Sequence, residues 1–308
     1  FWILQIFIPQ QLEEVLKMLT FLKPYTEIIR AQIGVYTIIF EGIESLLPRN
    51  SGFAWEPGAF SVFINFAIFL NLIFNKFKLR KNYAIYILII TLISTQSTTG
   101  YSIFLLIAVF YFMNINMGSG KVLFIPLLAI AILYVFNLPF MYEKIDALSN
   151  EKISDIVSAS QQEWNNDKVI GAQRFVSFQI DFIDFLENPI LGYGGHDEDM
   201  WIRKGNINIV SISGTGKILA RFGLVGSLFF LIVLYRNSKM FSKKFNFKGG
   251  LVLFFLIIQV SVSYSLIENP IFLCFWMFFY FNPNIESFDL NFNSKKIKNR
   301  NFILSTNK

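Results

Sequence analysis

The chain has 308 residues, of which 54% are hydrophobic, 18% aromatic and only 16% charged, and its mean hydropathy is +0.50. A soluble globular protein rarely combines such hydropathy with 37 Phe. The formal net charge of +6 could indicate a nucleic-acid partner, but the basic residues lie in short runs beside apolar segments, which favours a membrane instead. The single cysteine, Cys274, and the single histidine, His196, exclude a disulfide framework and a His-cluster metal site.

The first 57 residues combine an apolar start with a mixed segment. Residues 1–8 are apolar and carry neither Met nor a basic run, so we interpret them as the remnant of a truncated transmembrane helix. Residues 9–57 are expected to form a periplasmic loop. Apolar residues at helical spacing before Pro24 predict an amphipathic helix on the membrane surface there. Ala31–Leu47 is also apolar, but Glu41 and Glu44 argue against a span.

Seven apolar segments are candidates for membrane-crossing helices, since a bilayer core about 30 Å thick needs roughly 20 helical residues. They are Gly58–Asn75, Tyr83–Thr95, Gly100–Met113, Val122–Pro139, Thr215–Tyr235, Gly250–Leu266 and Pro270–Phe281. Residues 83–113 could form one broken helix or two helices. The Ser/Thr-rich stretch Ser94–Gly100 favours two. The sequence thus predicts transmembrane helices within 58–139 and 215–282.

Three basic runs set the orientation of these helices. Unopposed Lys and Arg residues follow the first span, fill the loop after residue 235 and recur in the tail 283–308. Placing all three runs in the cytoplasm gives an alternating topology with no span left over. Residues 140–214 then form a long periplasmic loop, in which acidic residues clearly outnumber basic ones. The tail is rich in Asn and Lys and is predicted to be disordered.

Within the long loop, Gly171–Glu187 has the clearest helical pattern. One face carries phenylalanines and the other carries polar residues: Phe175, Phe178, Phe182 and Phe185 against Arg174, Ser177, Asp181 and Asp184. Asn188-Pro189 ends the helix, and the glycine-rich Gly192–Gly195 turns the chain. The predicted fold class is therefore an all-α polytopic membrane protein, a transmembrane helix bundle with a long, partly helical periplasmic loop.

Two arginines could bind an anion. Arg174 is the only cation on the polar face of its helix, and it either clamps an anion or pairs with an acid such as Asp181. Arg221 would lie about 9 Å inside its span at 1.5 Å per residue. A central arginine costs about 2.5–3.5 kcal/mol on insertion scales, so it normally faces a cavity or a partner. A guanidinium holds phosphate oxygens bidentately and stays charged.

Two further stretches carry polar residues that could be functional or could have an ordinary structural role. The stretch Arg49–Gly58 (RNSGFAWEPG) brings an arginine and Glu56 to the outer mouth of a span. The same residues also suit an ordinary helix start with an interfacial tryptophan. His196 is followed by three acidic residues. It could be catalytic, but a histidine in such a setting is more often an ordinary solvated residue.

Three motifs in this order resemble those of one bacterial family. They are Arg49–Gly58, then Arg174 followed by Pro189–Gly194 (PILGYG), then Leu219–Gly226 (LARFGLVG). The stretch Ser94–Tyr101 (STQSTTGY) is typical of it as well. Together they are similar to the O-antigen polymerase and ligase superfamily of bacterial surface polysaccharide assembly. The resemblance covers roughly Arg49 to Phe281.

The resemblance implies an inverting, metal-independent glycosyltransferase without a cofactor, located in the bacterial inner membrane. Its donor would be an undecaprenyl-diphosphate-linked glycan, and its partners would include the lipid bilayer and other polysaccharide assembly proteins. Arg174 and Arg221 would be catalytic residues that grip the diphosphate, and fixed cations stabilise the developing charge of such a leaving group. Glu56 and His196 are candidate bases for the acceptor hydroxyl. Candidate substrate-binding residues are Arg49, Gly192, Gly194 and Arg203.

Several functions remain open at this stage. The ligase branch commonly has a His-Asn pair before the third motif, whereas this chain has Val210–Gly214 (VSISG). That departure and Glu56-Pro57-Gly58 favour a repeat-unit polymerase over a ligase that transfers glycan to lipid A core or protein. A polysaccharide transporter or flippase is the alternative from another class. Several predicted spans contain no ionisable residue, which argues against ion coupling. A non-catalytic membrane scaffold is the third alternative.

Overall fold

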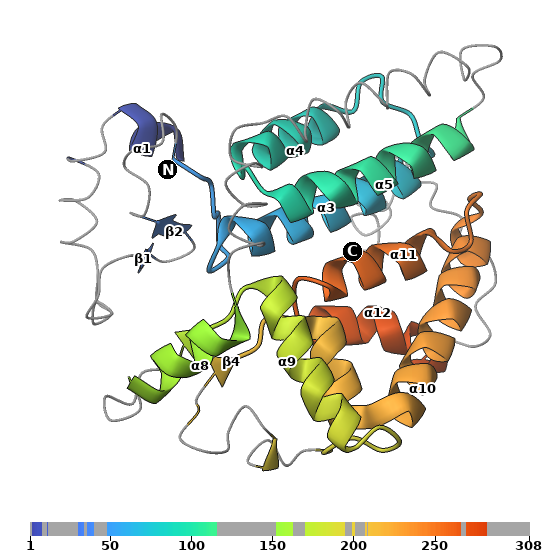
Figure 1. Ribbon diagram of the computed structural model, residues 1–308. Coiled ribbons are helices and arrows are strands. Elements are labelled where there is room, and N and C mark those ends of the chain that lie inside the picture. Colours follow the sequence, from blue (N-terminus) through green and yellow to red (C-terminus); the bar gives the residue numbers. More distant parts are fainter. Residues whose placement is uncertain are drawn as a thin grey trace, which may run out of the picture.

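The computed structural model of the chain is mostly helical (Figure 1). It describes residues 2–7, 11, 30–33, 36–39, 48–115, 152–162, 170–194, 199–200, 207, 209–265 and 269–281. The predicted span Val122–Pro139, the helix before Pro24, the tail 283–308, His196 and Arg203 lie outside these residues. A short helix, α1 (Trp2–Phe7), precedes the main group of helices.

The first helical group consists of α3 (Pro57–Phe74), α4 (Tyr83–Ser94) and α5 (Thr98–Asn114). Their ends lie close to those predicted. Helix α3 begins with proline because its fixed φ and missing N–H suit the first helical turn. The Ser/Thr-rich stretch is a break between two helices, as expected, and the Ser97 side chain caps α5 by accepting a hydrogen bond from the Gly100 N–H.

The second group consists of α10 (Gly214–Phe245), α11 (Val252–Ser261) and α12 (Pro270–Phe281). The first of these extends beyond the predicted membrane span, which ends at Tyr235. Helix α10 continues through the basic residues and ends where Asn246 adopts a left-handed conformation, since no Gly or Pro stops it earlier. Conversely, α11 ends before the predicted Leu266.

Helix α10 is kinked at Gly223. Its backbone angles there, φ 58° and ψ −163°, belong to a region that is essentially restricted to glycine. The helix therefore consists of two pieces, and Arg221 lies in the first one, just before the kink.

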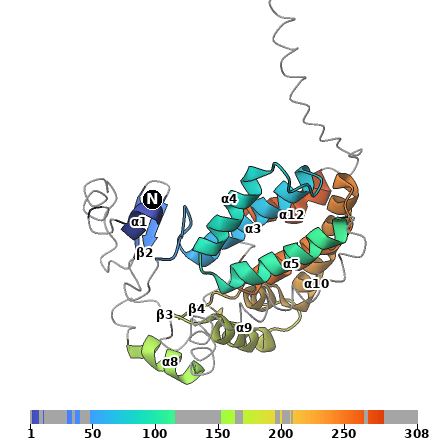
Figure 2. The same cartoon turned by 90° about the horizontal axis from the view of Figure 1, so that it is seen from above.

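The core lies between the two helical groups (Figures 1 and 2). Large apolar side chains from α3, α5, α10 and α11 form it, among them Phe69, Phe110, Leu234 and Leu256. Buried polar groups link the helices as well. The Asn65 Nδ2 of α3 donates to the Gly100 carbonyl oxygen of α5 at 3.0 Å. The amide of Asn237 in α10 donates to the Trp276 carbonyl oxygen of α12.

Among the described residues, the helices α3 and α10 are long and apolar enough to cross a membrane. Helices α4, α5 and α11 are apolar but shorter. At 1.5 Å per residue the 18 residues of α3 rise about 27 Å, close to the thickness of a bilayer core. The helical character of the fold is thus as predicted.

Two small sheets depart from the all-helical expectation. Strands β1 (Arg30–Ile33) and β2 (Tyr36–Ile39) pair antiparallel within the segment 9–57, where β-branched residues favour strands. Strands β3 (Ile170–Gly171) and β4 (Ile209–Val210) pair in parallel. This second pair joins the segment before α9 (Arg174–Glu187) to the segment before α10. Helix α8 (Ile153–Gln162) contacts the same pair.

Candidate functional site

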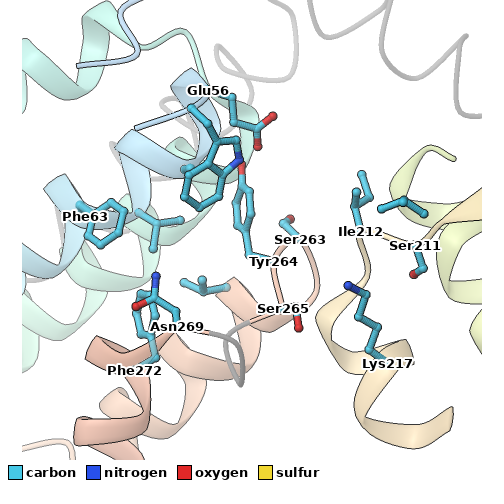
Figure 3. Close-up of a pocket in the computed structure, with 15 residues that line it drawn as sticks. Glu56, Phe63, Ser211, Ile212, Lys217, Ser263, Tyr264, Ser265, Asn269 and Phe272 are labelled. Atoms are coloured by element: carbon cyan, nitrogen blue, oxygen red, sulfur yellow. The ribbon is translucent and has the colours of Figure 1, made fainter. Parts of the chain in front are cut away.

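A cavity of about 530 Å³ lies at the ends of several helices (Figure 3). Its apolar lining includes Val62 and Phe63 of α3, Val260 of α11 and Phe272 of α12. Its polar lining comes mostly from the segments that connect helices: Glu56, Ser211, Ser263, Tyr264, Ser265 and Asn269, with Lys217 from α10. This volume and this mixture of an apolar wall with a few polar groups are typical of ligand sites.

Three helices begin at this cavity. Glu56, Ile212 and Asn269 line it, and α3, α10 and α12 start one or two residues after them. The N-terminal end of a helix carries a partial positive charge because its first backbone N–H groups have no partner within the helix. The cavity therefore has a positive contribution from the backbone in addition to that of its side chains.

Tyr264 is the residue around which the charged groups gather. It follows α11, and its hydroxyl accepts a hydrogen bond from Nη2 of Arg174 at 3.4 Å. The Arg174 guanidinium carbon lies 5.6 Å from the centre of the Tyr264 ring. Trp55 packs edge-on against the same ring at 6.4 Å between centroids. Burial raises the pKa of Tyr264, and the neighbouring charge of Glu56 raises it further.

The close approach of Tyr264 to α3 depends on Gly58. A Cβ at this position would overlap the Tyr264 hydroxyl and would lie 3.4 Å from Oε1 of Glu56. Glu56 immediately precedes α3 and makes no capping hydrogen bond with its side chain. Its carboxylate is therefore left to face the tyrosine and the cavity (Figure 3). The helix-start interpretation of Glu56-Pro57-Gly58 is confirmed, because α3 begins at Pro57. The site interpretation stays a prediction, and Glu56 lines the cavity.

Arg49 is the second arginine at this place. Its Nε donates to the Thr95 carbonyl oxygen at 3.4 Å. Partial desolvation lowers the pKa of the Arg49 guanidinium, the positive charge of Arg174 lowers it further, and the charges of Glu56 and Tyr264 oppose this. An arginine remains charged nonetheless. The structure thus brings Arg49, Glu56 and Arg174 together, although more than a hundred residues separate Arg174 from the other two.

Arg174 retains binding capacity. Its Nε is buried and has no hydrogen-bond partner among the described residues. The alternative partner for Arg174, Asp181, is engaged elsewhere: it accepts a hydrogen bond from Ser211 Oγ at 2.6 Å. A guanidinium N–H that is desolvated and unpaired costs free energy, which a bound anion would recover.

Arg221 belongs to a neighbouring but different cluster. Together with Lys217 it lowers the pKa of Asp181, although burial is the larger influence and raises that pKa to about 7. Asp181 lies on α9 and is 1% exposed. Lys217 lines the cavity, whereas Arg49, Arg174 and Arg221 do not. Arg174 contacts the cavity residue Tyr264. Arg174 and Arg221, expected from the sequence to grip one diphosphate, thus have different neighbours, and their shared role stays a prediction.

The glycine-rich turn is a docking element for the kink in α10. The N–H groups of Tyr193 and Gly194 donate to the carbonyl oxygens of Ala220 and Arg221. In return, the N–H groups of Leu224 and Val225 donate to the carbonyl oxygens of Pro189 and Ile190. The turn thus satisfies backbone groups that the kink releases. Gly192 and Gly194, expected to bind substrate, both have positive φ and serve this contact.

Three cavity residues were not predicted from the sequence: Tyr264, Asn269 and Lys217. Tyr264 is a single tyrosine in a short connection between apolar runs. Lys217 could have been found, because it lies four residues before Arg221 on one face of the helix. Among the described residues there is no group of three or more side chains that could hold a metal ion.

Comparison of the chain with protein-family models, with curated proteins and with solved structures finds no match.

Proposed function

We propose that this chain is a membrane glycosyltransferase that joins polyprenyl-diphosphate-linked oligosaccharide repeat units, a surface-polysaccharide polymerase. The observation that supports it is the cavity lined by Glu56, Lys217 and Tyr264. Arg174 donates a hydrogen bond to this tyrosine, and the charges of Arg174 and Glu56 act on Arg49. This site combines cations, one carboxylate and an apolar wall. The three sequence motifs that resemble the O-antigen polymerase and ligase superfamily supply several of these residues.

The cations would hold the diphosphate of the donor. Arg174 has a buried Nε without a hydrogen-bond partner among the described residues. The charges of Arg174 and Glu56 act on the Arg49 guanidinium, and Lys217 lines the cavity. The N-terminal ends of α3, α10 and α12, which follow the cavity residues Glu56, Ile212 and Asn269, add partial positive charge from the backbone. Such preorganised charge stabilises a diphosphate leaving group as its bond to the sugar breaks.

Glu56 is the base that this geometry favours. It lines the cavity, whereas the other candidate, His196, lies outside the described residues. In a single displacement, the acceptor hydroxyl oxygen would form a bond to the anomeric carbon while the bond from that carbon to the diphosphate oxygen breaks. Glu56 would take the hydroxyl proton, and the diphosphate would leave with the bonding electrons. The attack from the opposite side inverts the anomeric centre.

The proposal places the cavity at the outer side of the bacterial inner membrane. The cavity lies at the beginnings of α3 and α10, and the basic residues Lys76–Lys81 and Lys243–Lys248 lie at their other ends. Positive residues favour the cytoplasmic side. The apolar wall from α3 and α12 then offers a route for the lipid part of the donor.

The proposal assigns Arg221 a positioning role instead of contact with the diphosphate. Its backbone carbonyl accepts from the Gly194 N–H, and its charge acts on Asp181 of α9. Helix α9 begins with Arg174. Arg221 would therefore influence the donor through the placement of α9.

The test is elongation by the purified protein in liposomes. The substrate is a synthetic polyprenyl-diphosphate oligosaccharide of one repeat, and product length is read on a gel. We expect a ladder from the wild-type protein. We expect Arg174→Ala to slow elongation by about 10²–10³-fold, the usual effect of removing one such stabilising donor. Arg174→Lys should also be slow because a point charge cannot reproduce the fork of a guanidinium.

The matched control is Lys78→Ala, which removes a cation at the opposite end of the bundle and should elongate normally. If the wild-type protein left the one-repeat substrate unchanged, the polymerase proposal would be wrong. Transfer of the glycan to lipid A core, without lengthening, would indicate the ligase instead. A normal ladder from Arg174→Ala would remove this residue from the diphosphate site.

A further inference from the structure

Helix α9 exposes an apolar side and buries a mixed one. The buried side carries Val176, Ile180 and Phe185 as well as three polar residues. Ser177, Asp181 and Asp184 are buried, with exposures of 0%, 1% and 0%. Phe175, Phe178, Phe182 and Leu186 on the other side are 36% to 60% exposed. An amphipathic helix on the surface of a protein in water has the opposite orientation.

The inward orientation is held by hydrogen bonds to the segment before α10. Ser177 Oγ donates to the Ala172 carbonyl oxygen at 2.9 Å and accepts from the Ile212 N–H at 3.2 Å. Asp181 accepts from Ser211 Oγ at 2.6 Å, and its side chain occupies the space that a Cβ on Gly216 would need. Ser177 and Asp181 therefore have specific partners in the protein, and rotation of α9 would break these hydrogen bonds.

The outward side of α9 carries no charge. Between Phe175 and Leu186 the charged residues are Asp181 and Asp184, both buried. Phe178 and Phe182 stack at 6.1 Å between ring centroids. The side is thus apolar apart from the half-buried Gln179, which lies between Phe175 and Phe182. We call Phe175, Phe178, Phe182 and Leu186 the aromatic row.

The aromatic row continues into the apolar surface of α10. Ile190 and Leu191, 66% and 71% exposed, follow α9, and the Ile190 carbonyl oxygen accepts from the Val225 N–H at 3.1 Å. The exposed face of α10 then continues with large apolar residues: Leu224, Val225, Leu228, Phe229 and Ile232. Helix α10 is one of the two helices apolar and long enough to cross a membrane. Figure 1 shows α9 beside the first part of α10.

We propose that the aromatic row of α9 inserts into the outer leaflet of the bilayer, so that α9 is an interfacial helix and not part of an aqueous loop. The occupant of this surface is lipid, because the row is continuous with the α10 face that lipid would cover. Aromatic and aliphatic side chains without a charge among them fit acyl chains. The proposal rests on the membrane placement in the proposed function.

This placement determines the depth of Arg174. The arginine is the first residue of α9, so a helix lying at the interface holds its guanidinium near the level of lipid head groups. The diphosphate of a polyprenyl donor lies at the same level. Insertion of α9 would thus bring the cation and its anion to one depth, and Tyr264 would fix the lateral position of the cation.

Lipid contact can be measured with single cysteines that carry an environment-sensitive fluorophore. The background is Cys274→Ser, and the labelled positions are Phe182→Cys on α9, Leu228→Cys on α10 and Ser158→Cys on the exposed side of α8. The full chain is reconstituted in phosphatidylethanolamine–phosphatidylglycerol vesicles that contain a lipid with a nitroxide on its acyl chain. We expect quenching at Phe182 and Leu228 to be several-fold stronger than at Ser158.

Each result has a defined meaning. Quenching at Leu228 but not at Phe182 would overturn the insertion of α9 and leave the membrane placement of α10 intact. No lipid quenching at either position would overturn the membrane placement itself. Protection of Phe182 from both lipid and aqueous quenchers would indicate a second protein copy on the row and would also overturn the proposal.

A second variant pair tests the row without relying on one label. Phe178→Asp should lower lipid quenching at Phe182 several-fold, because a carboxylate disfavours insertion, whereas Phe178→Leu should leave it unchanged. Equal quenching in both variants would contradict lipid insertion of the row. The readout is independent of elongation, so its failure is distinguishable from failure of the polymerase assignment.

Discussion

Tyr264 lies where three distant parts of the chain meet. Its hydroxyl contacts Arg174, and its ring packs against Trp55. Gly58 leaves the space that the hydroxyl occupies. A hydroxyl between a guanidinium and the Glu56 carboxylate can orient the two groups without joining them in an ion pair. The tyrosine thus keeps the arginine available for a ligand.

Tyr264→Phe tests this positioning. It keeps the ring contacts and removes the hydroxyl, and a hydrogen bond to a charged group is worth about 1.5–3 kcal/mol. We expect elongation to fall by about 10- to 100-fold while the amount of protein in the membrane stays the same. Tyr86→Phe, on the exposed side of α4, is the control. Equal elongation by both variants would contradict the role of the hydroxyl.

At the scale of elements, the kink of α10 and the turn after α9 form one unit. Each supplies the backbone partners that the other lacks, through four hydrogen bonds between 189–194 and 220–225. Two of the three motifs are thus partners in space. Their glycines are needed for backbone conformation, which explains their spacing without any ligand.

Gly223→Ala should weaken this unit. Alanine at φ 58° and ψ −163° is strained, by about 1–3 kcal/mol, and its Cβ would overlap the Ile190 carbonyl. We expect a lower midpoint of thermal unfolding in detergent. Gly171→Ala is the matched control, since nothing lies within 4 Å of its added Cβ. Equal midpoints for the two variants would refute the structural role of the kink.

The contact between α9 and α10 should depend on pH through Asp181. Burial raises its pKa from 3.8 to about 7, so the folded state favours the neutral carboxyl. The stabilisation is full below the unfolded value and is lost as the pH rises through about 7. We expect the wild-type protein to unfold at a lower temperature at about pH 8 than at about pH 5. Asp181→Asn should flatten this dependence. The same dependence of unfolding temperature on pH in both proteins would contradict this role of Asp181.

The sequence predicts the helices better than it predicts the way they meet. Pro57 and Pro270 mark helix starts, and the Ser/Thr-rich stretch before Gly100 marks a break, because these signals act on their own residues. The kink at Gly223 lies within an apolar run that resembles a continuous helix. Of the predicted face of phenylalanines on α9, Phe175, Phe178 and Phe182 share an exposed side, but Phe185 is buried. Periodicity also does not indicate which side lies against the protein. That choice depends on Ser211 and Ile212, which become neighbours only in the fold.

The whole molecule has two chemically different ends. The cavity with its charged residues lies where α3 and α10 begin. The basic turns lie together at the opposite end, where Phe74 packs against Phe245 at 5.9 Å and the Asn114 side chain donates to the Lys248 carbonyl oxygen at 2.9 Å. This division is consistent with the predicted orientation, which remains a prediction.

Cysteine labelling in intact cells tests that orientation. In the Cys274→Ser background, a membrane-impermeant maleimide should label Ser158→Cys directly. It should label Lys78→Cys only after the membrane is permeabilised, because basic turns stay in the cytoplasm. Labelling of Lys78→Cys in intact cells, or protection of Ser158→Cys, would invert the topology and place the cavity on the wrong side for the proposed substrate.

Helix α11 has a consequence for the membrane around the protein. Its ten residues rise only about 15 Å, half of a hydrocarbon core about 30 Å thick. In the proposed placement, this hydrophobic mismatch forces the bilayer to thin beside α11 or lets water penetrate to its ends. Val260 and Tyr264 at one end of α11 line the cavity. The cavity would therefore open at the bottom of a depression, where a sugar chain stays hydrated while its lipid stays embedded.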